Sequence, residues 1–247
     1  MIIDGGGFSE GYFDIGKSVV APFLYHERIS NIDMVVLSHP HPDHLLGLIY
    51  IMNNFNVRQV WRSNLPIDLE DYPEWEKAIK LNKINVSLVS NEFPEKIFSG
   101  VRINVLWAPN YSVQETNNLS YDEVNDSSLV LKITFGKVSF LIPGDISADI
   151  EKQLIKSGVN LRSDILVVPH HGSAYSSSAE FIKAVACRFA IVSAGKTNVF
   201  HHPHPLTLQR YKDAGVNIFR TDRDGAVTFT TGGNDLHVDT FTNKKYE

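Results

Sequence analysis

The chain has 247 residues, 43% of them hydrophobic and 21% charged, which is typical of globular proteins. It has no apolar run near the roughly 20 residues that span a bilayer, and its start, MIIDGGGFSEGYFD, lacks the pattern of a signal peptide. We therefore expect a cytoplasmic protein that inserts in no membrane. The net charge of -5 excludes general attraction to nucleic acid, so a polyanionic partner needs local positive groups or bound cations.

Short apolar runs rich in β-branched residues alternate with amphipathic windows, which predicts a mixed α/β protein. The expected strands are residues 34–38, 59–62, 85–89, 101–107, 128–135, 137–142, 164–168, 190–193, 216–220 and 226–231. The expected helices are residues 44–54, 74–81, 148–156, 179–186 and 206–214. Only a tight turn at Gly136 separates two of the strands, which predicts an antiparallel hairpin and a mixed sheet. We expect one domain over residues 1–247, with a polar surface loop at 109–125 near a site.

The first candidate site follows a buried strand in MVVLSHPHPDHLLGL. The strand ends at Ser38, and the chain turns through two prolines before a helix begins. Four polar side chains thus meet at the carboxyl end of a strand, where α/β proteins usually bind ligands: His39, His41, Asp43 and His44. Neutral imidazoles and a carboxylate suit Zn²⁺, Mn²⁺ or Fe, and two neighbouring metals could share them. The alternative is a proline-rich surface turn, which does not need four such groups in six positions.

Two later apolar strands also stop at ionisable groups. SFLIPGDIS leads into Asp145, and DILVVPHHGS leads into His170 and His171. A carboxylate oxygen can bridge two cations, and the glycine after the histidines lets the backbone approach a bound substrate closely. Because an aspartate after a glycine also serves as a turn residue or a helix cap, Asp145 counts as a ligand only in the company of the other groups.

The segment NVFHHPHPLTLQRY places His201, His202 and His204 before a helix. Histidines near a helix N-terminus have a depressed pKa and, when neutral, can contact a phosphate oxygen. The alternative is a solvated capping segment. We expect the serines of HHGSAYSSSAE to be helix caps because no Ser-His-Asp order marks a nucleophile. Cys187, the single cysteine, excludes an intrachain disulfide, and its neighbours AVACRFAIV predict core packing.

Taken together, these motifs resemble the metallo-β-lactamase superfamily, and within it the ComEC-like hydrolases of bacterial competence. The resemblance runs from MIIDGGG to TDRDGAVTF and includes DIGKSVVAPFL, HPHPDH, NDSSLVLKITFGKVSFLIPGDIS, PHHGS and VFHHPHPLTLQRY. The HxHxDH signature is common to the superfamily, whereas PHHGS with HPHP favours the ComEC-like branch. The fold that the resemblance implies is an α/β (α+β), four-layer αββα sandwich of two mixed β-sheets.

The resemblance also implies a ligand set for two metals. His39 and His41 would bind one ion, Asp43 and His44 the second, and Asp145 would bridge them. His171 is favoured over His170 because the superfamily has a histidine immediately before the glycine; His170 would then orient it. Asp126 stands where members outside this branch tend to supply another histidine, so the first metal site is expected to be either weaker or completed by Asp126. His202 matches the family's HP element and would contact the scissile phosphate or protonate the leaving group.

Three departures from the family pattern stand out. The family domain begins with a strand and a DVGQGD segment, and this chain starts at IDGGG, so the first hairpin is expected to be missing or to lie upstream. His201 stands where the family usually has glycine. The ComEC membrane channel is absent, so a role in DNA uptake would require association with a separate channel.

The function we expect is metal-dependent phosphodiester hydrolysis, with DNA as the substrate and a metal-activated hydroxide as the nucleophile. The cofactors would be two divalent ions, Zn²⁺ or Mn²⁺, and the catalytic residues would be Asp43, Asp126 and His202. Four basic side chains could contact phosphates: Lys196, Arg210, Arg220 and Arg223. One alternative is hydrolysis of a small ester, lactone or amide by the same centre, and another is a non-catalytic DNA-binding or assembly module.

Overall fold

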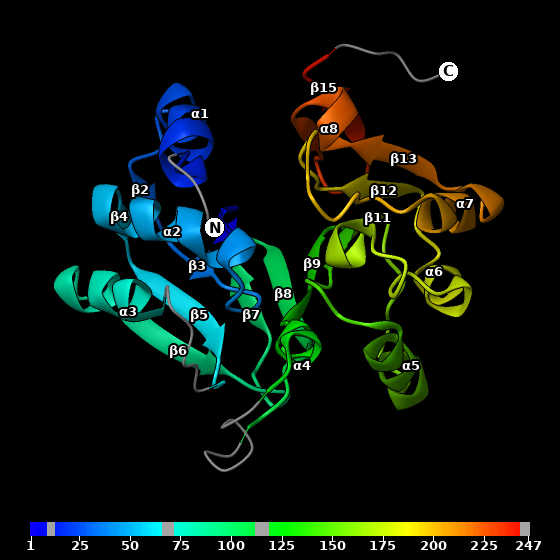
Figure 1. Ribbon diagram of the computed structural model, residues 1–247, viewed down its shortest axis with the longest axis horizontal. Helices are drawn as coiled ribbons and strands as arrows, with labels where there is room; N and C mark the ends of the chain where they lie inside the picture. Colours follow the sequence, from blue (N-terminus) through cyan, green and yellow to red (C-terminus); the bar gives the residue numbers. More distant parts are fainter. Residues whose placement is uncertain (9–12, 66–71, 112–118, 243–247) are drawn as a thin grey trace. The chain divides into compact units, whose positions relative to one another are not determined.

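The computed structural model describes residues 1–8, 13–65, 72–111 and 119–242. These residues form two compact units. The first unit comprises Met1–Glu92 and Ala108–Leu129, and the second comprises Phe93–Trp107 and Val130–Glu247. Each unit has its own sheet and its own helices, and the candidate site residues are divided between them (Figure 1).

The first unit is built on a parallel sheet in the order β1-β3-β5-β6. Its strands are β1 (Ile2–Ile3), β3 (Val35–Val36), β5 (Gln59–Ser63) and β6 (Asn85–Val89), and a small parallel pair joins β2 (Asn31–Ile32) to β4 (Asn56–Val57). Its helices are the π-helical turn η1 (Gly16–Val20), α1 (Ala21–His26), α2 (Pro42–Asn54), α3 (Tyr72–Leu81) and α4 (Tyr121–Asp126). Because neighbouring parallel strands point the same way, β1 and β3 end at the same edge of the sheet.

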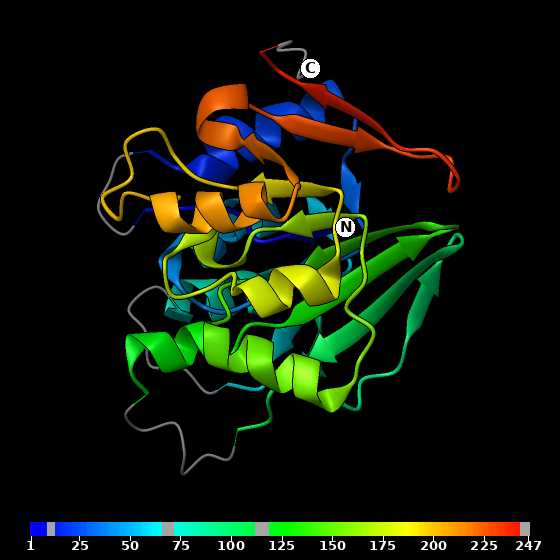
Figure 2. The same cartoon turned by 90° about the vertical axis from the view of Figure 1, so that its right-hand side faces the viewer.

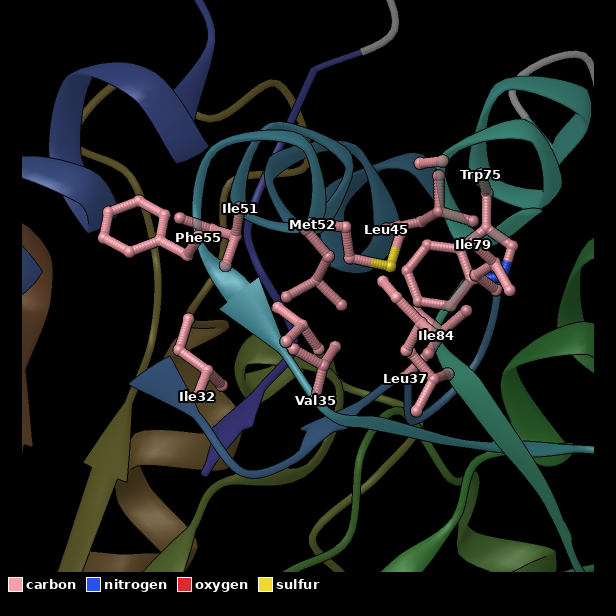
Figure 3. Close-up of a cluster of buried hydrophobic side chains, with 14 of the residues drawn as sticks. Ile32, Val35, Leu37, Leu45, Ile51, Met52, Phe55, Trp75, Ile79 and Ile84 are labelled. Atoms are coloured by element: carbon pink, nitrogen blue, oxygen red, sulfur yellow. The ribbon is translucent and has the colours of Figure 1, made fainter. Parts of the chain in front are cut away.

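The core of this unit lies between the sheet and helices α2 and α3 (Figure 3). On α2, Leu45, Leu48 and Met52 recur at helical spacing and are fully buried, and on α3 Trp75 is buried in the same cluster. Full burial of one large apolar side chain contributes about 1.5–3 kcal/mol. This packing fixes the N-terminus of α2, which carries the first candidate site.

A close backbone contact also fixes the start of α2. The N–H of Gly47 donates to the carbonyl of Gly6 at 2.8 Å, and the N–H of Gly5 donates to the carbonyl of His44 at 2.7 Å. A Cβ on Gly47 would clash with the backbone of Gly5. The glycines of IDGGG and the glycine inside α2 therefore allow the loop after β1 to lie directly against the helix.

The second unit is built on a seven-stranded mixed sheet in the order β13-β12-β11-β10-β9-β8-β7. The strands are β7 (Lys96–Phe98), β8 (Val101–Trp107), β9 (Val130–Phe135), β10 (Val138–Ile142), β11 (Ile165–Val167), β12 (Phe189–Val192) and β13 (Asn217–Arg220). Strands β7 to β10 pair antiparallel, and β10 to β13 pair parallel. A separate hairpin joins β14 (Val227–Thr230) and β15 (His237–Thr240).

Helices cover one face of this sheet (Figure 2). They are α5 (Ala148–Ser157), α6 (Ala179–Val185) and α7 (Pro205–Asp213); the 3-10 turn η2 (Pro169–Gly172) follows β11, and the short helix α8 (Thr221–Asp224) follows β13. Side chains such as Leu154, Phe181 and Tyr211 fill the core between helices and strands. Cys187 is buried in that core, as predicted.

The fold class is confirmed as a mixed α/β protein with several sheets. Every expected strand and helix forms, most within one or two residues of the predicted bounds, and Gly136 turns the β9–β10 hairpin with φ of 58°. Helices η1 and α1 were not predicted from the sequence, because Val19, Val20 and Pro22 disfavour a helix interior. Pro22 lies in the first turn of α1, where proline is tolerated.

The expectation of a loop over 109–125 is wrong at its end, where α4 forms. The hydroxyl of Ser120 accepts the N–H of Glu123, and the Glu123 carboxylate accepts the N–H of Ser120. This capping box satisfies two backbone donors at the helix start. Residues 112–118 of that predicted loop lie outside the described residues. Among the residues described, no helix combines the length and hydrophobicity needed to cross a lipid bilayer.

Candidate metal centre

The HPHPDH segment forms the turn from β3 into α2. His41 is the N-cap residue of α2 with extended backbone, and Pro42 occupies the first helical position, where its missing N–H costs nothing. The side chains of His39, His41 and His44 are buried, with at most 5% of each residue exposed. Asp43 is in the first turn, where a carboxylate interacts favourably with the helix dipole.

Asp4, which the sequence reading did not single out, organises this turn. Its carboxylate accepts the N–H and the hydroxyl of Ser38, both at 2.8 Å, and lies 2.8 Å from Nδ1 of His44. Because a carboxylate only accepts hydrogen bonds, Nδ1 of His44 carries the proton and Nε2 is the lone-pair nitrogen. Nε2 of His44 lies 4.0 Å from the Asp43 carboxylate. Asp4 therefore fixes both the tautomer and the orientation of His44.

A sequence signal for Asp4 was present. Asp4 follows the apolar strand β1 directly, as His39 follows β3 closely, and parallel neighbours end at one edge of the sheet. Asp4 also has a positive φ of 56°, which is uncommon outside glycine and costs free energy. Its three hydrogen-bonded contacts stabilise that conformation.

His39 and His41 present nitrogens to one another. Nε2 of His39 lies 3.0 Å from Nδ1 of His41, and Nδ1 of His39 lies 3.1 Å from the Ser38 hydroxyl. The two rings are nearly perpendicular, with an interplanar angle of 82°. Two nitrogens at this separation suit adjacent positions around one metal ion at nitrogen–metal distances of about 2.0–2.1 Å. The expected first pair of ligands is thus brought together within the first unit.

The second unit brings together Asp145, His170, His171 and His202. Asp145 is buried, with 4% exposed, and follows Gly144 at the end of β10. It does not cap α5: the N-cap there is Ser147, whose hydroxyl accepts the N–H of Asp149. Asp145 thus lies in a turn after β10, and the helix-cap alternative has no support at α5.

The two adjacent histidines of η2 differ in their contacts. Nδ1 of His171 lies 2.8 Å from the carbonyl oxygen of Ser193, so it carries the proton, and Nε2 lies 3.5 Å from the Asp145 carboxylate. Nε2 of His170 lies 3.8 Å from the same carboxylate. A ligating histidine usually donates its other N–H to an oxygen, so this arrangement favours His171 as the ligand.

Both histidines have left-handed backbone conformations, with φ of 50° at His170 and 53° at His171. Gly172 follows with φ of 84°, and a Cβ there would meet the ring of Pro203. The N–H of His204 donates to the carbonyl of Gly172 at 2.9 Å. Glycine thus lets the PHHG turn lie against the HPHP segment.

His202 lies over this turn. Its ring stacks on Phe200 with centroids 5.9 Å apart and approaches His170 at 5.7 Å. Burial, and to a smaller extent the charges of His170 and His171, lower the pKa of His202 to about 4. Its Nδ1 is buried without a hydrogen-bond partner among the described residues. A neutral imidazole of this kind suits a contact with substrate better than protonation of a leaving group.

The other residues that the sequence put forward have either structural partners or exposed side chains. His204 is the N-cap of α7, since its Nδ1 accepts the N–H of Leu206. Arg210 donates to the carbonyls of Ala174, Ser176 and Ser177, and Arg220 pairs with Asp222, so both guanidinium groups have structural partners. Lys196 and Arg223 are exposed. Ser178 caps α6, in line with the expected role of the serines.

The donor chemistry in each unit fits a divalent metal ion. His44 and His171 each have Nδ1 fixed by an oxygen, which leaves Nε2 as the metal donor. Nε2 of His39 and Nδ1 of His41 lie 3.0 Å apart. Neutral imidazole and carboxylate groups are donors for Zn²⁺ and Mn²⁺. Asp126, the last residue of α4, is partly buried.

Sequence comparisons find known proteins that are similar to this chain. The chain is 29% identical over 219 residues to ComE operon protein 3 of Bacillus subtilis. The aligned region covers 88% of this chain and 27% of that protein. It is 38% identical over 109 residues to competence protein ComA of Neisseria gonorrhoeae, covering 44% of this chain and 16% of that protein. The chain thus spans about a quarter or less of these relatives' lengths.

Among solved structures, the metallo-beta-lactamase fold protein YhfI from Bacillus subtilis is similar with a TM-score of 0.49 and 14% identity, covering 82% of this chain and 80% of that one. Residues 1–196 match the family model of the metallo-beta-lactamase superfamily. The chain therefore belongs to the metallo-beta-lactamase superfamily of metal-dependent hydrolases.

Proposed function

We propose that this chain hydrolyses phosphodiester bonds in DNA with a pair of divalent metal ions. The observation that carries the proposal is the convergence of Nε2 of His39 and Nδ1 of His41, 3.0 Å apart in a buried turn. The two rings are not both protonated there, because two imidazolium ions would repel at this distance. Such a pair needs a cation between its lone pairs or a shared proton.

The ligands follow from the family pattern and the hydrogen bonds of each unit. His39 and His41 would hold one ion, and Asp43 and His44 would hold the second. In the second unit, Asp145 and His171 are the proposed ligands, and His171 would bind through Nε2. Two bound divalent ions would lower the pKa of water from its bulk value of about 15.7 toward neutrality and would neutralise charge on the phosphoryl oxygens.

The protein groups around the ligands have separate tasks. Asp4 holds the Nδ1 proton of His44, and the carbonyl of Ser193 holds that of His171, so both Nε2 atoms remain basic. His202, neutral because its pKa is about 4, can donate one hydrogen bond to a phosphate oxygen. Asp126 would complete the first site.

DNA is the proposed substrate because the chain is similar to a competence protein of Neisseria gonorrhoeae and to ComE operon protein 3 of Bacillus subtilis. A net charge of -5 gives the protein no general attraction for DNA, so bound cations would supply the attraction at the site. We further propose that the chain acts beside a separate membrane channel during DNA uptake.

Cleavage of end-labelled single-stranded and double-stranded DNA tests the proposal. Metal-stripped protein is resupplied with Mn²⁺ or Zn²⁺ and compared with the double variant Asp43→Asn, Asp145→Asn. The control is Asp33→Asn, Asp149→Asn, which removes one exposed carboxylate from each unit. We expect metal-restored cleavage by the wild type and the control, and none by the first variant.

Two results would favour other functions. If the protein binds metal and leaves DNA intact but opens a lactone or an ester, it is a small-molecule hydrolase. If it binds DNA but no metal, it is a non-catalytic binding module. Calorimetric titration with each metal, run on the same preparations, separates these two results.

A further inference from the structure

Helix α4 lies against the histidine turn of the first unit. The ring of Tyr121, the first residue of α4, stacks on the ring of His41 with centroids 3.7 Å apart and an interplanar angle of 14°. Beyond the other end of α4, the N–H of Leu129 donates to the carbonyl of Ser38 at 2.9 Å. The helix is therefore anchored to the segment that carries His39 and His41 at both ends.

Asn125 lies on the face of α4 that carries this contact. An α-helix turns by about 100° per residue, so Asn125, four residues after Tyr121, projects within about 40° of it. Asp126, one residue later, projects about 140° away from Tyr121. The helix thus directs Asn125, rather than Asp126, to the side of His41.

The carboxamide of Asn125 is buried and unsatisfied. Asn125 is 2% exposed, and neither Oδ1 nor Nδ2 has a hydrogen-bond partner among the described residues. A buried amide without partners is costly, and native proteins rarely keep one unless a water, an ion or a ligand satisfies it. The backbone carbonyl of Asn125 is paired, since it accepts the N–H of Ser128 at 3.0 Å. The side chain alone lacks a partner.

We propose that the carboxamide oxygen of Asn125 is a ligand of the metal ion held by His39 and His41. This inference rests on the metal centre proposed above and assigns its third donor from the first unit. Amide carbonyl oxygens are suitable ligands for divalent ions and bring no charge of their own. The Nδ2 donor of Asn125 is then available to a phosphate oxygen of the substrate. Asn125 then takes the place at the first ion that the family pattern gives to Asp126, and Asp126 would act from outside the ligand shell.

Two variants of Asn125 test the assignment by metal binding rather than by turnover. Asn125→Leu has nearly the same shape and no donor atom, whereas Asn125→Asp keeps an oxygen at the same position. Metal-free proteins are titrated with Mn²⁺ by calorimetry, and the Mn²⁺ electron paramagnetic resonance spectrum is recorded. We expect Asn125→Leu to weaken one of the two binding steps by at least about tenfold and to change the spectrum. Asn125→Asp should retain both steps.

The matched control is Ser127→Ala, which removes a buried hydroxyl that donates to the carbonyl of Val124 at 2.6 Å at the end of the same helix. It should bind both ions as the wild type does. Asn125→Leu should melt no earlier than the wild type without metal, because it removes an unsatisfied polar group. Should it fail to fold, Asn125→Ser, whose shorter side chain cannot reach the ion, replaces it in the comparison.

Wild-type affinity and an unchanged spectrum in Asn125→Leu would overturn the assignment, as would loss of the binding step in Ser127→Ala to the same degree. The outcome is independent of the substrate. If the wild type binds metal and cuts no DNA, the proposed function fails while the titration still tests Asn125. If the wild type cuts DNA and Asn125→Leu binds metal normally, only the assignment of Asn125 fails.

Discussion

The carboxylate of Asp4 lies 2.8 Å from Nδ1 of His44 and also accepts two hydrogen bonds from Ser38. Asp4 directly follows β1, and His44 lies in the first turn of α2, so this contact joins the edge of the sheet to the start of the helix. An ionised carboxylate behind a ligating imidazole fixes the ring and raises its basicity.

Replacing Asp4 with asparagine should therefore weaken metal binding. The amide keeps one acceptor but loses the charge, so His44 is held less firmly and its Nε2 becomes a poorer donor. We expect affinity for one ion to fall about 10- to 100-fold in calorimetric titration. Asp33→Asn, which removes an exposed carboxylate paired with Arg58, should leave affinity unchanged. Equal affinities in the two variants would contradict this role of Asp4.

Replacing Gly172 with alanine should distort the PHHG turn. Gly172 has φ of 84°, and a Cβ would press on Pro203, so the variant carries both backbone strain and a steric clash. Gly158→Ala is the matched control, because Gly158 has φ of 75° with open space around it. We expect the control to lose about 1–2 kcal/mol of unfolding free energy and Gly172→Ala to lose more. Denaturant melts measure both free energies of unfolding. Equal losses would show that Pro203 moves away from the added Cβ at little cost.

Glu151 should make stability depend on pH. It is fully buried, and its carboxylate accepts the N–H groups of Ser177 and Ser178. Burial raises the pKa of Glu151 above its usual 4.5. The folded state therefore holds the proton more tightly than the unfolded state, so this stabilisation is present below pH 4.5 and is lost as pH rises through the folded pKa.

Glu151→Gln, which has no charge, should remove that contribution. The unfolding free energy of the variant relative to the wild type should rise across the window above pH 4.5, as measured by urea melts at a series of pH values. Glu180→Gln on the exposed surface of α6 is the control and should track the wild type. A constant difference at every pH would mean that Glu151 titrates alike in the folded and unfolded chains.

Metal removal should lower thermal stability if ions hold the ligands together. A ligand that binds only the folded state raises the free energy of unfolding by about 2.7 kcal/mol when its concentration is 100 times its dissociation constant. We expect a chelator to lower the melting temperature of the wild type and added Mn²⁺ or Zn²⁺ to restore it. The Asp145→Asn variant should respond less. Calorimetric melts that do not change with metal would contradict metal binding.

Much of the secondary structure was predictable because local pattern decides it. The apolar runs around Val86, Ile103 and Leu141 formed strands near the predicted bounds, and Gly136 turned the expected hairpin. Helix α4 was missed because its stability comes from a capping box between Ser120 and Glu123 in an otherwise polar segment. There the deciding interactions were hydrogen bonds rather than hydrophobic periodicity.

The candidate ligands were also predictable, since histidines and carboxylates after buried strands are visible in sequence. Spacing alone could not distinguish His170 from His171. The family resemblance favoured His171, and the 2.8 Å contact between Nδ1 of His171 and the carbonyl of Ser193 supports that choice. Spacing also could not show that the guanidinium group of Arg210 donates to loop carbonyls, because those contacts join residues more than 30 positions apart.

By itself, the sequence determined the class of fold, most strands and helices, and the residue types able to bind metal, because these depend on neighbours along the chain. The tertiary structure decided the orientation of His44 by Asp4, the tautomer of His171 and the burial of Asn125 beside the histidine turn. Those properties arise where parallel strands and a distant helix converge, and the directions of side chains there depend on packing that no local pattern encodes.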